Sequence, residues 1–199
     1  LRPPSGLGRD RDADHPLARL LIINTPSECV IGGQADDVAG VIRDLGCEGF
    51  YLDGVVTVHC DAALSAADAY RALHVFPTHP PEGVTFYSCP LGRSHTLTTA
   101  GAADSILKGA LEGFDFPETV RAAYDDGVRI FLEMGPGASC TRMIGQILAD
   151  RPHLAVSACV RGEPDELTVV KLLAALIAER VPVDLSLLYG DAPQATDRP

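Results

Sequence analysis

Residues 128–139 read VRIFLEMGPGAS, and this stretch decides the class of fold. Its first seven residues are mostly apolar and predict a strand of the kind that is buried in a parallel sheet. The Gly-Pro-Gly sequence that follows predicts a tight turn, whose glycines let the backbone approach a neighbour or a ligand closely. Ser139 is predicted to cap the next helix. The apolar face of that helix carries Met143, Ile144, Ile147 and Leu148. On local physics alone, a plain turn without a chemical role is the favoured interpretation.

Strands and helices alternate on both sides of this junction. LAVSACV (154–160) predicts a strand, a helix is expected over about 165–180, and VPVDL (181–185) predicts a last short strand. The elements predicted upstream are a short strand at 83–88 and helices at 102–111 and 117–126. Such alternation is typical of layered α/β folds.

The N-terminal third predicts the order strand, strand, helix, strand. ARLLIIN (18–24) and CVIGG (29–33) read as strands on either side of a turn. The helix is predicted from apolar residues at i, i+3, i+4 and i+7, which are Val38, Val41, Ile42 and Leu45. VVTV (55–58) predicts a strand that ends at His59. Because a ferredoxin-like domain runs βαββαβ, this ββαβ order corresponds to its last four elements.

Composition excludes several classes of protein. Acidic residues outnumber basic ones 27 to 16, which gives a formal net charge of −11. This balance argues against a nucleic-acid partner and against an anionic membrane surface. The six cysteines lie far apart without a CxxC pair, and no signal peptide precedes them, so we expect reduced thiols and a cytoplasmic location. The apolar runs are too short to span a bilayer.

His59 is the most informative single residue. It directly follows the predicted strand, and loops at the carboxyl ends of strands carry the functional residues of many α/β folds. An imidazole at this position can act as a general base. Taken alone, however, the residue is more often a histidine whose hydrogen bonds are satisfied locally, without a catalytic role.

Other chemistries are not supported by the residues around His59. Cys60 would point to the opposite face of the strand, which argues against a Cys-His pair. No metal-ligand spacing is present, so we expect no metal site. A serine hydrolase would carry a GxSxG elbow, but Gly92-Arg93-Ser94-His95-Thr96 lacks the last glycine. The sequence therefore contains a candidate base but no elbow for a nucleophile.

Several of these segments together resemble a known family. They are INTPSECVIGG (23–33), GVVTVHC (54–60), GVTFYS (83–88) and LEGFDFPETVRAAYDDGVRIFLEMGPGASCTRMI (111–144). In this order they resemble the C-terminal half of the malonyl-CoA:acyl carrier protein transacylase-like acyltransferase domains of type I polyketide and polyunsaturated fatty acid synthases. The resemblance runs from about residue 20 to residue 190.

The resemblance implies roles for two positions. His59 takes the place of the catalytic histidine, which accepts the proton of a serine that attacks an acyl-CoA thioester. Gly109 takes the place of an Asn or Gln whose backbone carbonyl orients that histidine. The serine elbow and the arginine that binds a malonyl carboxylate precede the matched region in the family. Cys60 replaces the family's usual serine, a change that we interpret as packing.

The resemblance also implies a division of the chain. We expect a partial acyltransferase fold of the α/β class, with a ferredoxin-like small-subdomain remnant (ββαβ) and the C-terminal part of an α/β-hydrolase-like large subdomain. The expected ranges are a linker at 1–17, the remnant at 18–58, the large-subdomain part at 59–153, a post-acyltransferase linker subdomain at 154–190 and a tail at 191–199.

The implied function is a segment of an acyltransferase of polyketide or fatty-acid synthesis. It would help to move an acyl group, malonyl in the first instance, from coenzyme A to the phosphopantetheine thiol of an acyl carrier protein. Acyl-CoA and phosphopantetheine would be substrates, and no cofactor is expected to be bound. The implied partners are the carrier protein, the upstream half of the acyltransferase and neighbouring synthase domains. The chain alone is expected to be inactive. Two alternatives stay open: a non-catalytic docking or structural segment of a megasynthase, and a free-standing ferredoxin-like binding module.

Overall fold

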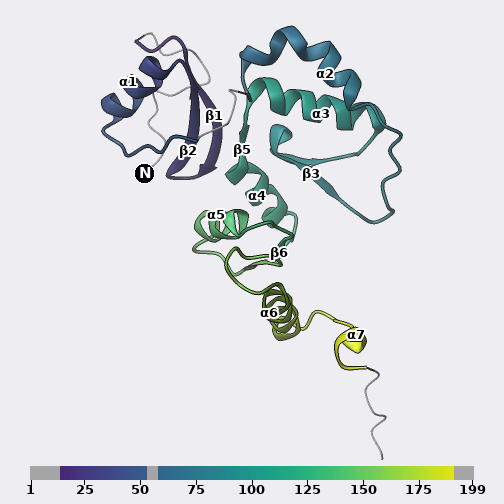
Figure 1. The fold of residues 1–199 in the computed structure, drawn as a ribbon. Helices are drawn as coiled ribbons and strands as arrows, with labels where there is room; N and C mark the ends of the chain where they lie inside the picture. The colour runs from purple at the N-terminus through teal and green to yellow at the C-terminus, as the bar shows by residue number, and fades with distance from the viewer. Residues whose placement is uncertain (1–13, 53–57, 191–199) are drawn as a thin grey trace, which may run out of the picture. The chain divides into compact units, whose positions relative to one another are not determined.

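The computed structural model describes residues 14–52 and 58–190 (Figure 1). Its contacts divide the chain into two compact units. The first consists of Leu1–Arg129 with Met143–His153, and the second of Ile130–Arg142 with Leu154–Pro199. These units follow packing rather than the predicted domain boundaries, which stay predictions.

The first unit begins with the hairpin that the alternating apolar residues predict. Strands β1 (Ala18–Thr25) and β2 (Glu28–Gly33) pair antiparallel, with Leu20 opposite Ile31. Helix α1 (Ala35–Leu45) packs on both strands and ends at Gly46, whose φ of 60° is left-handed. Both strands were predicted to within one residue of their ends, and the helix forms where the spacing of its apolar residues predicted it. The predicted strand 55–58 falls almost entirely on residues 53–57, which lie outside the described residues.

A third strand joins this sheet from far along the chain. Strand β5 (Phe114–Asp115) pairs parallel to β1, with Phe114 opposite Ile22, so the order is β2-β1-β5. It lies between helices α3 (Thr99–Glu112) and α4 (Phe116–Asp125) (Figure 1). The side chain of Asp115 caps α4 by accepting a hydrogen bond from the backbone N–H of Glu118 at 2.9 Å. The junction of the two helices is thereby attached to the N-terminal hairpin.

The segment that follows His59 is mostly helical. A 3-10 helix, η1 (Asp61–Ala66), leads directly into α2 (Ala67–Leu73), and α2 packs on α3. A short hairpin of β3 (Phe86–Ser88) and β4 (Arg93–His95) encloses the one-turn η2 (Cys89–Leu91). The hydroxyl groups of Ser88 and Ser105 form a buried hydrogen bond that ties this hairpin to α3.

The second unit is built around two parallel strands. Strand β6 (Ile130–Glu133) pairs with β7 (Leu154–Ser157), and α6 (Asp165–Ala178) packs on β7. The predicted parallel strands and the predicted helix are thus confirmed, with shorter bounds, but the predicted burial of β6 is wrong, because Leu132 is 44% exposed and no residue of this strand is fully buried. A short α7 (Ser186–Tyr189) follows.

The predicted strand at 181–185 is wrong, because these residues carry no strand pairing and lie between α6 and α7. The N–H of Val181 bonds to the carbonyl of Leu176 and so completes the end of α6. Arg180 has a left-handed φ of 61°, and Pro182 has no N–H to donate to a ladder. Val181 therefore belongs to the end of α6 and not to a strand.

Helix α5 (Ser139–Ile147) follows the Gly-Pro-Gly turn, and Ile144, Ile147 and Leu148 of its predicted apolar face are buried. The predicted cap is wrong: Ser139 is already the first helical residue. Instead, the carboxylate of Glu133 accepts hydrogen bonds from the backbone N–H groups of Cys140 (3.2 Å) and Thr141 (2.7 Å). The last residue of β6 thus satisfies donors at the start of α5, because a carboxylate is favoured at the positive end of a helix.

Glu133→Gln is expected to lower the free energy of unfolding by about 1 kcal/mol at neutral pH. Burial acts to raise the pKa of this carboxyl, but the N–H groups of Thr141, Cys140 and Ser139 favour the ionised form and hold the pKa below its ordinary 4.5. A lowered folded-state pKa gives a contribution that is complete above the unfolded value and is lost as the pH falls through the folded one. Urea unfolding should therefore show a difference in the free energy of unfolding between Glu133→Gln and the wild type that is smaller at acidic pH than at neutral pH. Glu163→Gln, which removes an exposed pair with Lys171, serves as the control.

Candidate active site

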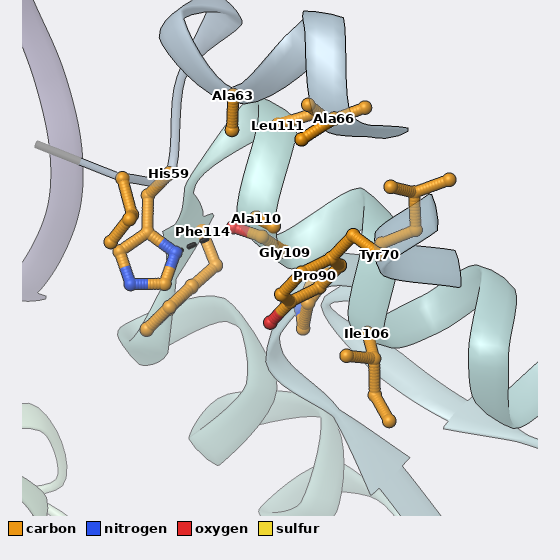
Figure 2. A pocket seen from close by; sticks show the side chains of 12 residues that line it. His59, Ala63, Ala66, Tyr70, Pro90, Ile106, Gly109, Ala110, Leu111 and Phe114 are labelled. Carbon is orange, nitrogen blue, oxygen red and sulfur yellow. Dashed lines mark hydrogen bonds between the residues drawn. The ribbon is translucent and has the colours of Figure 1, made fainter. Parts of the chain in front are cut away.

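The imidazole of His59 is held by the main chain of α3. Its Nδ1 lies 2.5 Å from the carbonyl oxygen of Gly109, as the dashed line in Figure 2 shows. Gly109 belongs to the last turn of α3, where carbonyls lack a partner within the helix. The structure therefore brings together the two site residues predicted from the sequence, which are 50 positions apart.

This contact determines which nitrogen of His59 can act as a base. A backbone carbonyl can only accept a hydrogen bond, so Nδ1 must carry the proton. In the neutral ring the lone pair then belongs to Nε2, and the tautomer is set by the bond that the other nitrogen makes. In the described part of the chain, Nε2 has no hydrogen-bond partner. The ring is thus oriented to accept a proton at Nε2.

The backbone of His59 is left-handed, with a φ of 65°. Such a conformation is uncommon for a residue with a side chain and persists where the surrounding structure enforces it. The edge of the ring meets Phe114 of β5, with centroids 5.2 Å apart and the planes at 84°. The strand predicted to end at His59 lies outside the described residues, so its place at a strand tip stays a prediction.

A cavity of about 390 Å³ opens beside His59. Its walls come from η1, α2, η2, α3 and β5, and its side chains are almost all apolar (Figure 2). The lining includes Ala63, Ala66, Tyr70, Pro90, Ile106, Leu107, Gly109, Ala110, Leu111 and Phe114. This volume falls in the range of small-molecule sites in proteins.

The absence of a side chain at Gly109 is required by its neighbour. A Cβ atom built on Gly109 would lie 2.7 Å from Cγ of Pro90 in η2. The position can therefore offer its carbonyl to His59 while Pro90 packs closely on the helix. This explains how a glycine can stand where the resemblance expects an Asn or Gln.

Cys60 does not share the environment of His59. It is buried, at 6% exposure, and lines a separate hollow of about 420 Å³ with Arg19, Gln34 and Asp61. Burial among packed residues agrees with the packing interpretation of this cysteine and not with a Cys-His pair. Within residues 14–52 and 58–190, no group of three or more His, Cys, Asp or Glu side chains could hold a metal ion.

Sequence reasoning missed two features of this site. Phe114 was not singled out, and the only hint in the sequence is the glycine that precedes it. In the structure this Gly113 has a left-handed φ of 72°. The left-handed backbone of His59 has no sequence signal.

None of the helices that the structure describes has the length and apolar character that crossing a membrane requires.

The chain is similar to two curated synthases, although no family model matches it. One is a subunit of the polyunsaturated fatty acid synthase of Thraustochytrium sp., which is 25% identical over 181 residues, covering 85% of this chain and 9% of that protein. The other is polyketide synthase GfsB of Streptomyces halstedii, which is 25% identical over 178 residues, covering 87% of this chain and 3% of the relative. The chain therefore spans less than a tenth of each curated relative.

Solved structures show which fold this chain has. The acyltransferase domain from the second module of the salinomycin polyketide synthase superimposes with a TM-score of 0.75 at 22% identity, covering 87% of this chain and 41% of that one. The malonyl-CoA:acyl carrier protein transacylase FabD of Xanthomonas oryzae gives 0.67 at 19% identity, with 80% and 49% covered. The chain is thus a homologue of polyunsaturated fatty acid and polyketide synthases, and its α/β fold is that of part of an acyltransferase domain.

Proposed function

We propose that this chain is the part of an acyltransferase domain that supplies the catalytic base, His59, for moving an acyl group from coenzyme A to the phosphopantetheine thiol of an acyl carrier protein. The observation that carries the proposal is the contact between His59 Nδ1 and the Gly109 carbonyl, which leaves Nε2 available for a proton. Similarity to fatty acid and polyketide synthases supports the reaction class. Malonyl is the acyl group to test first.

The proposed chemistry runs in two steps. A serine from the nucleophile-bearing half attacks the acyl-CoA thioester carbon, Nε2 of His59 takes the serine proton, and the coenzyme A thiol leaves with a proton. The carrier thiol then gives its proton to Nε2 of His59 and attacks the acyl-serine ester, and the imidazolium returns that proton to the serine oxygen as it leaves. During each step the ring is cationic, with its Nδ1–H directed at the C-terminal end of α3. A cation is favoured at this negative end of a helix, so the Gly109 carbonyl supports the charged intermediate state.

We also propose the domain assignment that the sequence suggested. In this interpretation β1, β2 and α1 belong to a ferredoxin-like small-subdomain remnant within 18–58. Residues 59–153 belong to the C-terminal part of the large subdomain, and 154–190 to a post-acyltransferase linker subdomain. The similarity to part of acyltransferase domains supports this assignment.

The direct test joins the chain to an acyltransferase half that carries a GxSxG serine. Labelled malonyl-CoA is then added, with a carrier protein as acceptor. We expect label on the serine and then on the carrier protein, and neither when the serine half or this chain is used alone. Failure of the joined protein to label in the presence of correctly folded halves would contradict the proposal.

A non-catalytic role in a megasynthase is the second candidate, because the 199 residues contain no GxSxG elbow. A parent protein that takes up no acyl label from any acyl-CoA would favour this role. Covalent attachment of an acyl group to the parent protein would exclude it.

Arginines are the side chains on which an acidic carrier protein would dock, and Arg121, Arg129, Arg142 and Arg151 are the candidates. The guanidinium of Arg129 stacks 3.7 Å above the ring of Tyr124, and that of Arg151 lies 5.1 Å from the same ring. Arg151 is paired with Asp125 at 3.0 Å. Arg129 and Arg151 thus gather at one aromatic side chain.

Arg129→Gln is expected to raise KM for the carrier protein about threefold to tenfold in the joined enzyme, with little change in kcat. The effect should shrink as salt is added, because it is electrostatic. Steady-state kinetics at two salt concentrations measure it. Arg43→Gln, in the last turn of α1, changes the charge equally and is the control. An equal rise of KM in both variants would show that the location of the charge is irrelevant.

A further inference from the structure

Strand β1 contacts the chain immediately after His59 through an ion pair. Nε of Arg19 donates to Oδ1 of Asp61 at 3.1 Å, and Asp61 is the first residue of η1. The Nη1 of the same guanidinium donates to the carbonyls of Pro16 (2.6 Å) and Ala18 (2.9 Å). The Arg19 side chain is only 18% exposed. Since two carbonyl contacts fix the guanidinium at the start of β1, its bond to Asp61 restrains the position of Asp61 relative to this strand.

The same strand contacts His59 from a second direction, through β5. Phe114, whose ring meets the imidazole, pairs with Ile22 of β1. A Cβ atom on the preceding Gly113 would lie 2.2 Å from the carbonyl oxygen of Leu21 and 3.1 Å from that of His59. The main chains of β1, β5 and His59 therefore pack directly on one another.

These contacts lie at a strained residue and at the residues that directly follow it. A non-glycine residue keeps a positive φ only when neighbouring structure over-determines its conformation. Buried Cys60 and the Asp61–Arg19 pair restrain the chain just after His59, and the β5 contact restrains His59 itself. The pair thus connects the second residue after His59 to β1.

We infer that Arg19 and Asp61 are positioning residues that hold the backbone of His59 in its left-handed conformation and so keep Nδ1 on the Gly109 carbonyl. Their effect on acyl transfer rests on the proposed function, whereas their effect on the orientation of the His59 ring does not. Asp61 is about half exposed, at 52%, and exposed pairs add little to overall stability. The loss of the pair should therefore act on the ring more than on the fold.

The first experiment reads the ring without using activity. Diethylpyrocarbonate adds a carbethoxyl group to unprotonated imidazole nitrogens, and peptide mass spectrometry of the full chain counts the groups on each histidine. In the wild type, His59 should take one group, at Nε2, because Gly109 covers Nδ1. In Arg19→Met and in Asp61→Ala, a released ring should take a second group at Nδ1. In Arg19→Lys, the extent of this second labelling should lie between the wild type and Arg19→Met, because lysine keeps the charge but not the fork of donors.

Internal and matched controls accompany this measurement. His74 and His153 also have Nδ1 on backbone carbonyls, those of Tyr70 and Arg151, each at 2.7 Å, so their labelling should not change. Arg71→Met removes another Arg–Asp pair of the same unit, with Asp104 at 2.6 Å, and should leave His59 with one group. The melting temperature should fall by no more than about 2–4 °C in each variant. One group on His59 in both folded Arg19→Met and folded Asp61→Ala would overturn the inference.

The second experiment measures transfer in the joined enzyme. Arg19→Met should lower kcat about tenfold or more at unchanged KM for acyl-CoA, because misplacing a catalytic group by about 1 Å costs up to 10²-fold. A purely structural role would lower the amount of active enzyme and would not change the labelling of His59. If the wild type transfers no acyl group but the labelling changes as described, the proposed function fails and the positioning stands. Full activity together with unchanged labelling would refute the positioning alone.

Discussion

His59→Gln is expected to lower kcat for acyl transfer by a factor of about 10²–10⁴ in the enzyme joined to its nucleophile half. Glutamine has a similar reach to the Nε2 position, but its neutral amide cannot accept the serine proton. The acyl-enzyme should therefore form and decay slowly, since both steps need the base. Stopped-flow or quench kinetics with labelled malonyl-CoA would measure the two steps separately.

His74→Gln is the matched control for this prediction. His74 also has its Nδ1 on a backbone carbonyl, that of Tyr70, and its ring lies 4.5 Å from the Tyr70 ring. It is not among the residues that line the cavity beside His59, so its replacement should leave kcat within about twofold. Near-normal kcat in folded His59→Gln would remove His59 from the mechanism, whatever its geometry.

Gly113→Ala is expected to lower the free energy of unfolding by about 3 kcal/mol, which combines backbone strain with a steric clash. Its φ of 72° is left-handed, and its new Cβ would lie 2.2 Å from the carbonyl oxygen of Leu21. Both the β1–β5 pairing and the contact with His59 would have to shift. Urea unfolding measures the loss, and carbethoxylation of His59 shows whether the ring moves with it.

Gly83→Ala separates the two causes of this loss. Gly83 has nearly the same φ, 77°, but nothing lies within 4 Å of its Cβ direction. It should therefore cost only the backbone strain, about 1 kcal/mol. Equal losses in the two variants would show that β1 and His59 do not pack on Gly113 as described.

Sequence patterns located the elements whose residues repeat at a regular period. The β1–β2 hairpin and α1 were predicted because apolar residues recur at strand or helix spacing, and α4 was predicted over 117–126, where Pro117 suits the first turn of a helix. The segment 61–73 was not predicted as helical, although its alanines favour a helix. Strand β5 has only two residues, and its pairing with β1 comes from tertiary structure that no local pattern contains.

Among the site residues, too, some were found from the sequence pattern and others were not. His59 could be singled out from its position after a β-branched run, but its neighbour Gly109 came only from the family resemblance. A glycine in a helix has no chemical signature, and its role depends on a carbonyl and on Pro90 nearby. The left-handed φ of His59 and the pair between Arg19 and Asp61 arise from packing between segments about 40 residues apart in the chain, Arg19 and Asp61 being separated by 42.

Because the acceptor opposite His59 is a peptide carbonyl, side-chain mutagenesis at position 109 cannot delete it. An alanine scan would register only the collision with Pro90 and would assign the residue to the scaffold. Only chemistry on the polypeptide itself, such as an ester in place of the amide that follows Gly109, would weaken this oxygen and expose its role.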